Sequence, residues 1–426
     1  MNKYIESMSD TAKGNPQNLP LVEYVLGRIQ TLKKETGTGR TIFAACPNSR
    51  AVIRAAIRSA KRCNAPIKFA ATLNQVDFDR GYTGLTQKEF VKLIHQEAEK
   101  INYTGPVIIA IDHGGPWLKD AHRLANLPYE KTMELVKKSM IEALEAGYNL
   151  LHVDPTVDIT LKKGETIDIE TVAERTVEII THVETYRREE GIPKISYEVG
   201  TEEVHGGLAD MAVFRKFLNL LKKGLAQNGL EEVWPCFIVG KVGTDLHTTT
   251  FDPEVAKQLT EEAGKFGSVI KGHYSDNVSN PEAYPLAGMG GANVGPEFTE
   301  MEYDGLMECV SIEEALYNKG KVPKLSEFKS VLWQAVIDSE RWKKWLLAAE
   351  ENKEFDSLDA DRQLWLIKTG CRYIWENPQV VAARLRLMEN LTSQGIDAES
   401  IVLFPIEKSM EKYFYSFNLV DLNNEL

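Results

Sequence analysis

The sequence predicts an α/β fold in which eight strands close into a (β/α)8 TIM barrel, followed by a helical cap at the C-terminus. Eight short apolar segments between residues 41 and 294 alternate with segments of helical periodicity. Their starts recur roughly every 36 residues, a length that suits one βα unit. A doubly wound open sheet is the alternative, but it usually carries a Gly-rich turn after its first strand, where this chain has CPNSR. We therefore favour the barrel.

The predicted strands are short, apolar and bounded by Gly, Pro or polar residues. They cover Thr41–Cys46, Ile67–Thr72, Val107–Asp112, Leu150–Asp154, Ile195–Gly200, Cys236–Val239, Val269–Lys271 and Gly291–Val294. The predicted helices have apolar residues at the spacing of one helical face. They cover Leu21–Lys33, Ser49–Cys63, Gln87–Ile101, Tyr129–Ala146, Ile169–Arg188, Ala212–Gly224 and Pro253–Phe266.

The pattern changes after residue 320, where strand-like segments stop and helical periodicity continues to the end of the chain. We predict a barrel domain over residues 1–320, including an N-terminal helix, and a helical cap over residues 321–426. Five of the seven Trp lie in the cap: Trp333, Trp342, Trp345, Trp365 and Trp375. We expect these rings to form core and interface and not a ligand-binding cage.

Composition and charge argue against several classes of protein. The 426 residues include 62 acidic and 50 basic ones, a net charge of −12, which disfavours binding to nucleic acid or to an anionic membrane surface. The longest apolar segments, such as Pro106–Ile111, are too short to span a membrane, and the N-terminus lacks the apolar segment of a secretory signal. Five Cys without a CxxC spacing are expected to be reduced thiols. Together these features predict a cytoplasmic enzyme.

Polar residues follow the predicted strands at the end of a TIM barrel that carries the chemistry. The candidate metal ligands at these positions are His113, His247, His273 and Glu202. Neutral imidazole with carboxylate suits one divalent ion of Zn, Mn, Ni or Co, and an open catalytic site is favoured because a closed structural zinc site usually contains thiols. The candidate substrate contacts are Asn48, Asn74, Gln75, Asp154, His205, Asp276 and Asn293.

Two neighbouring strands carry competing interpretations. Adjacent strand residues face opposite sides, so Asp112 and His113 share one site only if the chain turns there, which the following Gly-Gly-Pro permits. Asp112 is then either the acid/base or the orienting partner of a metal-bound imidazole. His152 has the same parity as Asp154 and could face the barrel interior, but we favour a packing role for it.

Several segments carry a family resemblance over roughly residues 40–395. They are Ala71–Thr86, Asp112–Pro116, His152–Thr156, Glu170–Arg175, Ser196–Glu202, Asp245–His247, Gly272–Asp276, Asn293–Thr299 and Arg372–Trp375. On these segments the chain resembles the GatZ/KbaZ family, the Z-type subunits of class II D-tagatose-1,6-bisphosphate aldolase, some of which look like ketose 4-epimerases. The resemblance implies a TIM barrel with one divalent metal, Asp112 as acid/base and His113, His247 and His273 as ligands. It further implies Glu202 as a fourth ligand or second acid/base, and Asn293 as the aldolase strand-eight Asn.

The resemblance suggests a divalent-metal-dependent 4-epimerase that interconverts fructose- and tagatose-type ketohexoses or their phosphates by C3–C4 retro-aldol chemistry. The alternatives are a class II tagatose-bisphosphate aldolase and a non-catalytic subunit that stabilises such an aldolase. A kinase is disfavoured because the chain has no P-loop and no kinase glycine loop. The short Gly-Ser-rich phosphate loop and the Asp-Thr pair of class II aldolases are also missing, so free and phosphorylated ketoses both stay open. A homo-oligomer and association with an aldolase catalytic subunit stay open too.

Overall fold

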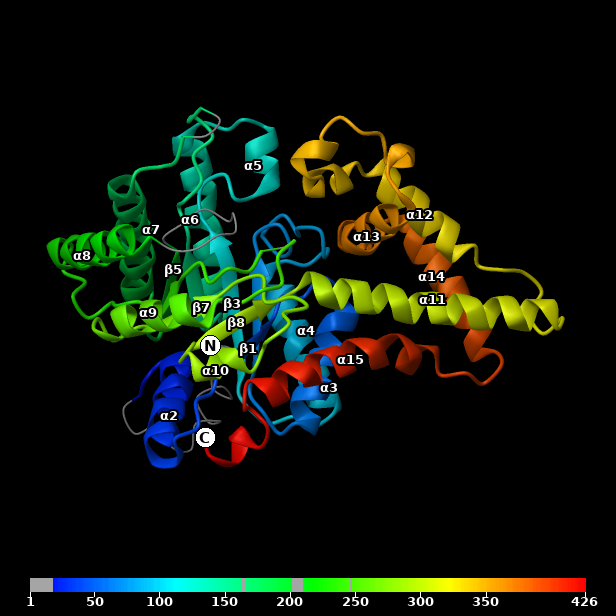
Figure 1. The fold of residues 1–426 in the computed structure, drawn as a ribbon, viewed down its shortest axis with the longest axis horizontal. Helices are drawn as coiled ribbons and strands as arrows, with labels where there is room; N and C mark the ends of the chain where they lie inside the picture. Colours follow the sequence, from blue (N-terminus) through cyan, green and yellow to red (C-terminus); the bar gives the residue numbers. More distant parts are fainter. Residues whose placement is uncertain (1–17, 163–164, 201–209, 246) are drawn as a thin grey trace.

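A computed structural model describes residues 18–162, 165–200, 210–245 and 247–426 of the chain. Its centre is a closed barrel of eight parallel strands in sequence order (Figure 1). The strands are β1 (Ile42–Ala45), β2 (Ile67–Thr72), β3 (Val107–Gly114), β4 (Leu150–Val153), β5 (Ser196–Gly200), β6 (Phe237–Val239), β7 (Val269–Gly272) and β8 (Gly291–Val294). The predicted (β/α)8 barrel is confirmed, and the eight predicted strands lie where the sequence placed them, with small differences at their ends.

Helices surround the barrel and connect successive strands (Figure 1). They are α2 (Leu21–Thr36), α3 (Arg50–Arg62), α4 (Gln87–Lys100), α5 (Asp120–Leu124), α6 (Tyr129–Ala146), α7 (Ile169–Glu189), α8 (Met211–Gln227), α9 (Pro253–Gly264) and α10 (Ala283–Leu286). Their starts follow local capping chemistry: the Ser49, Asp168, Asp210 and Asp252 side chains each accept hydrogen bonds from backbone N–H groups of the first turn. A reciprocal capping box between Thr86 and Glu89 begins α4.

Strand β3 is irregular at the point where the site residues lie. It runs two residues beyond the predicted end at Asp112, and its pairing with β4 shifts register between Ile111 and Gly114. His113 has a φ of 50°, an unusual value for a residue other than Gly. Gly115 is required next, because a Cβ atom there would lie 1.9 Å from the Asp154 carbonyl oxygen. This bulge supplies the turn that lets Asp112 and His113 face one region.

The C-terminal helices form a second layer beside the barrel, on the side away from α7–α9 (Figure 1). They are α11 (Pro296–Asn318), α12 (Phe328–Asp338), α13 (Ala360–Gly370), α14 (Pro378–Thr392) and α15 (Ala398–Ser416), with short 3-10 turns between them. All five cap Trp belong to, or pack against, a separate apolar core that runs from Tyr303 to Val402. The chain then returns, and residues from Leu403 to Leu422 join the barrel core.

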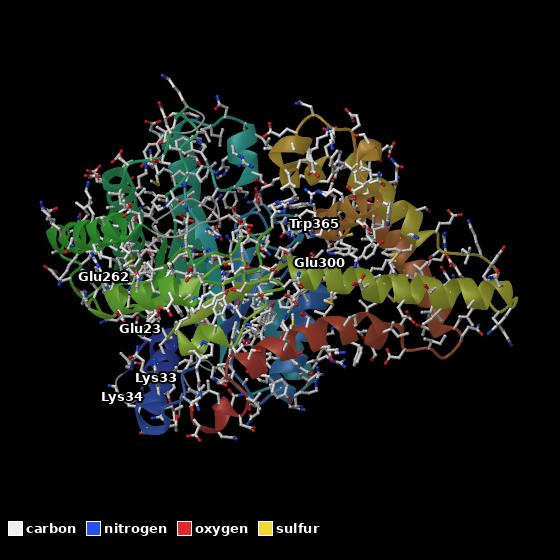
Figure 2. All side chains as sticks on the ribbon, in the orientation of Figure 1. Glu23, Lys33, Lys34, Glu262, Glu300 and Trp365 are labelled. Atoms are coloured by element: carbon white, nitrogen blue, oxygen red, sulfur yellow. The ribbon has the colours of Figure 1, made fainter. Side chains whose placement is uncertain are left out.

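The cap contacts loops at the carboxyl ends of several strands. Tyr373, in the 3-10 turn η4 (Cys371–Tyr373), packs edge-on against Tyr82, which follows β2, with ring centroids 5.2 Å apart. Arg341 pairs at 2.5 Å with Asp120, which follows β3. Figure 2 shows Trp365 of α13 on the side of the cap toward the barrel. The cap therefore adjoins the end of the barrel where TIM-barrel sites form.

Two further predictions can be compared with the described residues. None of their helices combines the length and the apolar character needed to cross a bilayer. All five Cys are unpaired, as expected for a chain without a disulfide framework.

Candidate active site

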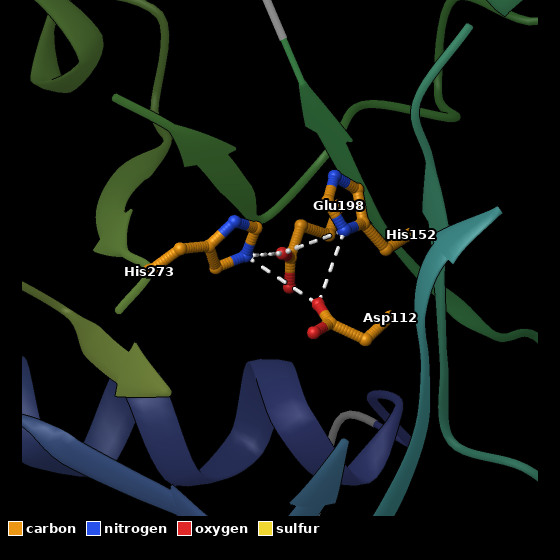
Figure 3. Close-up of side chains that lie close together, drawn as sticks. All are labelled: Asp112, His152, Glu198 and His273. Atoms are coloured by element: carbon orange, nitrogen blue, oxygen red, sulfur yellow. Dashed lines mark hydrogen bonds and ion pairs between the residues drawn. The ribbon is translucent and has the colours of Figure 1, made fainter. Parts of the chain in front are cut away.

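Four buried side chains from four strand ends converge inside the barrel: Asp112 on β3, His152 on β4, Glu198 on β5 and His273 directly after β7 (Figure 3). Each offers one ligand atom, and these atoms lie within 4.8 Å of one another. We call these four residues the donor cluster. Two imidazoles with two carboxylates form a mixed N/O set that divalent transition metals accept.

The spacing of the donor cluster suits a small cation. His152 Nδ1 lies 3.3 Å from both Asp112 Oδ1 and Glu198 Oε1. His273 Nε2 lies 3.4 Å and 3.6 Å from the same two oxygens. Ligand atoms about 2.0–2.1 Å from a tetrahedral ion are about 3.3–3.4 Å apart, so four of the six edges already have nearly this length. His273 Nε2 is also a buried atom without a hydrogen-bond partner among the described residues.

The protonation of His152 strengthens this reading. Its Nδ1 accepts a hydrogen bond of 3.0 Å from the His113 backbone N–H, which requires an unprotonated Nδ1. An unprotonated nitrogen facing two carboxylate oxygens at 3.3 Å is repulsive unless a cation lies between them. The donor cluster thus needs positive charge, and His152 would give up the backbone hydrogen bond in order to bind a metal.

Two buried lysines supply positive charge from inside the barrel. Lys271 on β7 forms an ion pair with Glu198 Oε1 and lies 3.4 Å from Asp112 Oδ1. Lys68 on β2 lies 3.3 Å from Glu198 Oε2. Both lysines are at most 1% exposed, so the two carboxylates are neutralised by two ammonium groups. Lys271 contacts the same oxygens that a dication would use, so ammonium and metal compete there.

Charge pairing outweighs burial for both carboxylates. Burial raises the pKa of Asp112, but Lys271, His113 and His273 together hold it well below its usual range. Burial also raises the pKa of Glu198, and Lys271 and Lys68 hold it well below its usual range. Burial, with Lys271 nearby, lowers the pKa of Lys68 to about 8 despite the attraction of Glu198. Both carboxylates are therefore ionised, the state that metal coordination requires.

A second group lies beside the donor cluster and shares His152 with it. His113 Nδ1 is 2.5 Å from Asp154 Oδ2, and the other Asp154 oxygen accepts a hydrogen bond of 2.6 Å from Thr156. The His113 ring lies 4.3 Å from the His273 ring, measured between centroids. Burial lowers the pKa of His113, but Asp112 and Asp154 raise it above its usual value overall. Asp154 therefore orients an imidazole that can carry a proton next to the donor cluster.

The structure brings some of the predicted metal ligands together and leaves others apart. Asp112, His113 and His273 meet at the barrel centre. His247 is exposed, and its ring lies 5.3 Å from the Trp365 ring of the cap, so the described structure does not bring it to the donor cluster. Glu202 and His205 lie outside the described residues. The roles assigned to these three residues stay predictions.

Three of the predicted substrate contacts use their amides within the protein. Asn48 accepts hydrogen bonds from Gln75 and Tyr82 and donates one to the Gly295 carbonyl. Asn74 connects the β2 and β3 loops by donating to the Leu118 carbonyl and accepting from the Asp120 N–H. These contacts hold neighbouring loops together at the rim of the barrel. A substrate role for Asn48, Asn74 and Gln75 stays a prediction.

Asn293 and Asp276 differ from those three amides. Asn293 on β8 is 3% exposed, and neither side-chain atom has a hydrogen-bond partner among the described residues. An unsatisfied buried amide is costly, so this side chain is available to a substrate hydroxyl. Asp276 is buried, and its Oδ1 accepts hydrogen bonds from the Gly295 and Glu297 N–H groups at 2.8 and 2.9 Å.

The sequence interpretation missed Glu198 and both lysines, and it expected only packing from His152. A signal was present: Lys68, Glu198 and Lys271 are charged residues within otherwise apolar strand segments. Charged side chains are almost never fully buried unless they are paired. A charge in each of three buried strands of one barrel therefore predicts an interior ionic group.

With this geometry established, the chain can be compared with known proteins. A family model described as D-tagatose-1,6-bisphosphate aldolase subunit GatZ/KbaZ-like matches residues 28–412. The chain belongs to this family. The resemblance drawn from sequence segments is thereby confirmed.

Two solved structures are similar to the chain. One, described as a probable tagatose 6-phosphate kinase from Sinorhizobium meliloti 1021, has a TM-score of 0.72 and 21% identity over 88% of this chain and 100% of that one. A fructose-bisphosphate aldolase from Campylobacter jejuni has a TM-score of 0.55 and 13% identity over 95% of each chain. At these identities the two structures support the barrel fold alone.

Proposed function

We propose that this GatZ/KbaZ-family protein is a divalent-metal-dependent 4-epimerase that interconverts fructose- and tagatose-type ketohexoses or their phosphates. The observation that carries the proposal is the donor cluster, because it joins four mixed N/O donors at nearly tetrahedral spacing. A protein that only stabilises a partner subunit has no physical need for such a cluster. The bound metal would be one ion of Zn, Mn, Ni or Co, held by Asp112, His152, Glu198 and His273.

The proposed reaction breaks and remakes the C3–C4 bond of the ketose. A divalent metal supplies Lewis-acid polarisation of the ketose carbonyl when it is bound. A carboxylate, for which Asp112 is the described candidate and Glu202 the other, accepts the C4 hydroxyl proton. The electron pair of the C3–C4 bond moves to C3 and leaves an aldehyde at C4. Attack on the opposite face of this aldehyde, with return of the proton, gives the C4 epimer.

Neighbouring residues provide proton transfer and substrate contacts in this scheme. His113 is oriented by Asp154 at 2.5 Å and lies next to Asp112 in the chain, so it can exchange a proton with the same region. Asn293 offers an unsatisfied amide to a ketose hydroxyl. Water must stay out while the aldehyde turns over, and the cap beside the strand ends favours this retention.

Epimerase and aldolase differ in whether the aldehyde fragment is kept. The test is to treat the purified protein with EDTA and then add Zn, Mn, Ni or Co separately. Each sample is incubated with fructose, fructose 6-phosphate or fructose 1,6-bisphosphate, and sugars and trioses are measured by chromatography. We expect metal-dependent formation of the tagatose-type sugar without triose.

Other outcomes contradict the proposal. Release of triose from the bisphosphate would favour a class II aldolase. No turnover with any metal, together with no bound metal by elemental analysis, would favour the non-catalytic subunit. In that case the protein should raise the thermal stability of a class II aldolase catalytic subunit when the two are mixed.

A further inference from the structure

An arginine of the cap is buried without a carboxylate partner. Arg372 in η4 is 5% exposed, and no described carboxylate lies within ion-pair distance of its guanidinium. Its one described side-chain hydrogen bond goes to the Tyr373 hydroxyl at 3.2 Å. The guanidinium lies over two rings, 4.7 Å from the centroid of Trp345 and 5.0 Å from that of Tyr373. A buried charge of this kind is costly unless an anion completes it.

Arg372 lies near the mouth of the barrel. Burial raises the pKa of Tyr274 to about 13, and Arg372 opposes this increase while Asp112 adds to it. Burial likewise raises the pKa of Asp276 to about 7 against a smaller opposing effect of Arg372. One phenol, which directly follows His273 in the chain, is therefore close to both Arg372 and the donor cluster. The distance between the two is suited to opposite ends of one sugar.

Positive charge accumulates around Arg372 although the chain is acidic overall. Asp120 is surrounded by Arg123 at 3.0 Å, Arg341 at 2.5 Å and Lys344 at 3.1 Å, so its single charge leaves an excess of cations. Arg341 also lies 4.3 Å from the Tyr373 ring centroid. Burial raises the pKa of Tyr373, but Arg372, Lys344 and Arg341 together hold it below its usual value. The junction between cap and barrel therefore has a positive potential.

The usual phosphate position of a TIM barrel is filled by the protein itself. In such barrels a phosphate often binds loops after strands 7 and 8 and the start of a following helix. Here Asp276, from the loop after β7, accepts the Gly295 and Glu297 N–H groups at the start of α11. A carboxylate thus occupies the backbone donors that would otherwise hold a phosphate. A phosphorylated ligand needs another cation at this end of the barrel.

We propose that Arg372 binds the phosphate of a phosphorylated ketose, so that the cap takes over phosphate recognition from the β7 and β8 loops. This inference deepens the proposed function, on which it rests for the ketose end of the ligand. The planar guanidinium can bind a phosphate through two parallel hydrogen bonds, while its contacts with Trp345 and Tyr373 hold its plane. The preferred substrate is then a ketose phosphate and not a free ketose.

Binding can be measured without turnover by calorimetry on metal-free protein with fructose 6-phosphate and with fructose. We expect the unmodified protein to bind fructose 6-phosphate more tightly than fructose. Arg372→Met should weaken fructose 6-phosphate binding about 10- to 100-fold, because one charge-assisted contact is lost, and leave fructose binding within about threefold. Arg372→Lys keeps the charge without the two parallel donors, so it should retain part of the preference.

Arg123→Met is the matched control, because it removes one cation from the same positive region at a side chain that is 47% exposed. We expect its preference for fructose 6-phosphate to stay within about threefold of the unmodified protein. Equal binding of the two sugars by the unmodified protein, or an equal loss in Arg123→Met and Arg372→Met, would overturn the assignment. If Arg372→Met does not fold, an unchanged preference in Arg372→Lys would do the same. Failure here would leave the epimerase proposal standing for a free ketose, while absence of turnover would leave this binding result unaffected.

Discussion

The barrel interior and the cap both bury cations, but only the barrel gives each cation a carboxylate. Lys271 and Lys68 lie at most 1% exposed against Glu198, and Lys271 also faces Asp112. Arg372 is nearly as buried but lacks a carboxylate partner among the described residues. A complete ion pair stabilises the protein that contains it, whereas an incomplete one indicates a ligand. The two regions therefore have different tasks, one to hold reacting atoms and the other to recognise a charged group.

The largest expected effect separates two histidines, one from each region. His273 belongs to the donor cluster, while His247 packs on Trp365 of the cap. His273→Ala should lower metal affinity and turnover by more than about 100-fold, since even loss of an orienting partner costs about 10- to 100-fold. His247→Ala should keep its metal content, as measured by elemental analysis after dialysis. Loss of metal from His247→Ala would show that the loop carries this residue to the cluster, as the sequence predicted.

Lys271→Met tests the pairing inside the barrel. Without this ammonium, Glu198 and Asp112 face each other as buried carboxylates, so the metal-free variant should lose about 3–5 kcal/mol of unfolding free energy in urea. The same change removes the competitor for those oxygens. Added Zn or Mn should therefore stabilise Lys271→Met more than the unmodified protein.

Arg372→Met provides the comparison for that experiment, since no carboxylate is left unpaired when its guanidinium is removed. Its unfolding free energy in the absence of ligand should stay within about 1 kcal/mol of the unmodified protein. A loss as large as that of Lys271→Met would show that Arg372 has a structural partner, and the contrast between the two regions would fail.

The sequence predicted the barrel well because strand and helix formation here depends on local patterns. Short apolar segments, capping residues such as Asp252, and Gly residues at turns all act within a few positions of the chain. The polar strand ends identified Asp112, His113 and His273 by the same reasoning, since a barrel brings all strand ends together. Glu198 and His152 were missed because they lie within their strands, where an interior charge depends on partners from other strands. The use of Asn48 and Asn74 between loops was likewise set by loop contacts that no local pattern contains.

Asp276 offers a smaller test at the junction of the two regions. Its pKa is raised from an ordinary 3.8 to about 7, mainly by burial, so the ionised form is less favourable in the folded protein than in the unfolded chain. The folded state therefore binds more protons between about pH 4 and pH 7, and stability falls as pH rises through this window. Asp276→Asn keeps an oxygen for the Gly295 and Glu297 N–H groups but does not ionise.

The unfolding free energy of Asp276→Asn, minus that of the unmodified protein, should therefore grow with pH across this window and level off above it. The total gain should reach at most about 4 kcal/mol, from roughly three pKa units at about 1.4 kcal/mol each. Urea unfolding at several pH values measures this difference, and Asp356→Asn, at an exposed carboxylate, provides the control. A difference that does not change with pH would mean that Asp276 ionises freely in the folded protein. The carboxylate would then remain charged beside Arg372 and serve as its partner, which would remove the reason to assign that arginine to a phosphate.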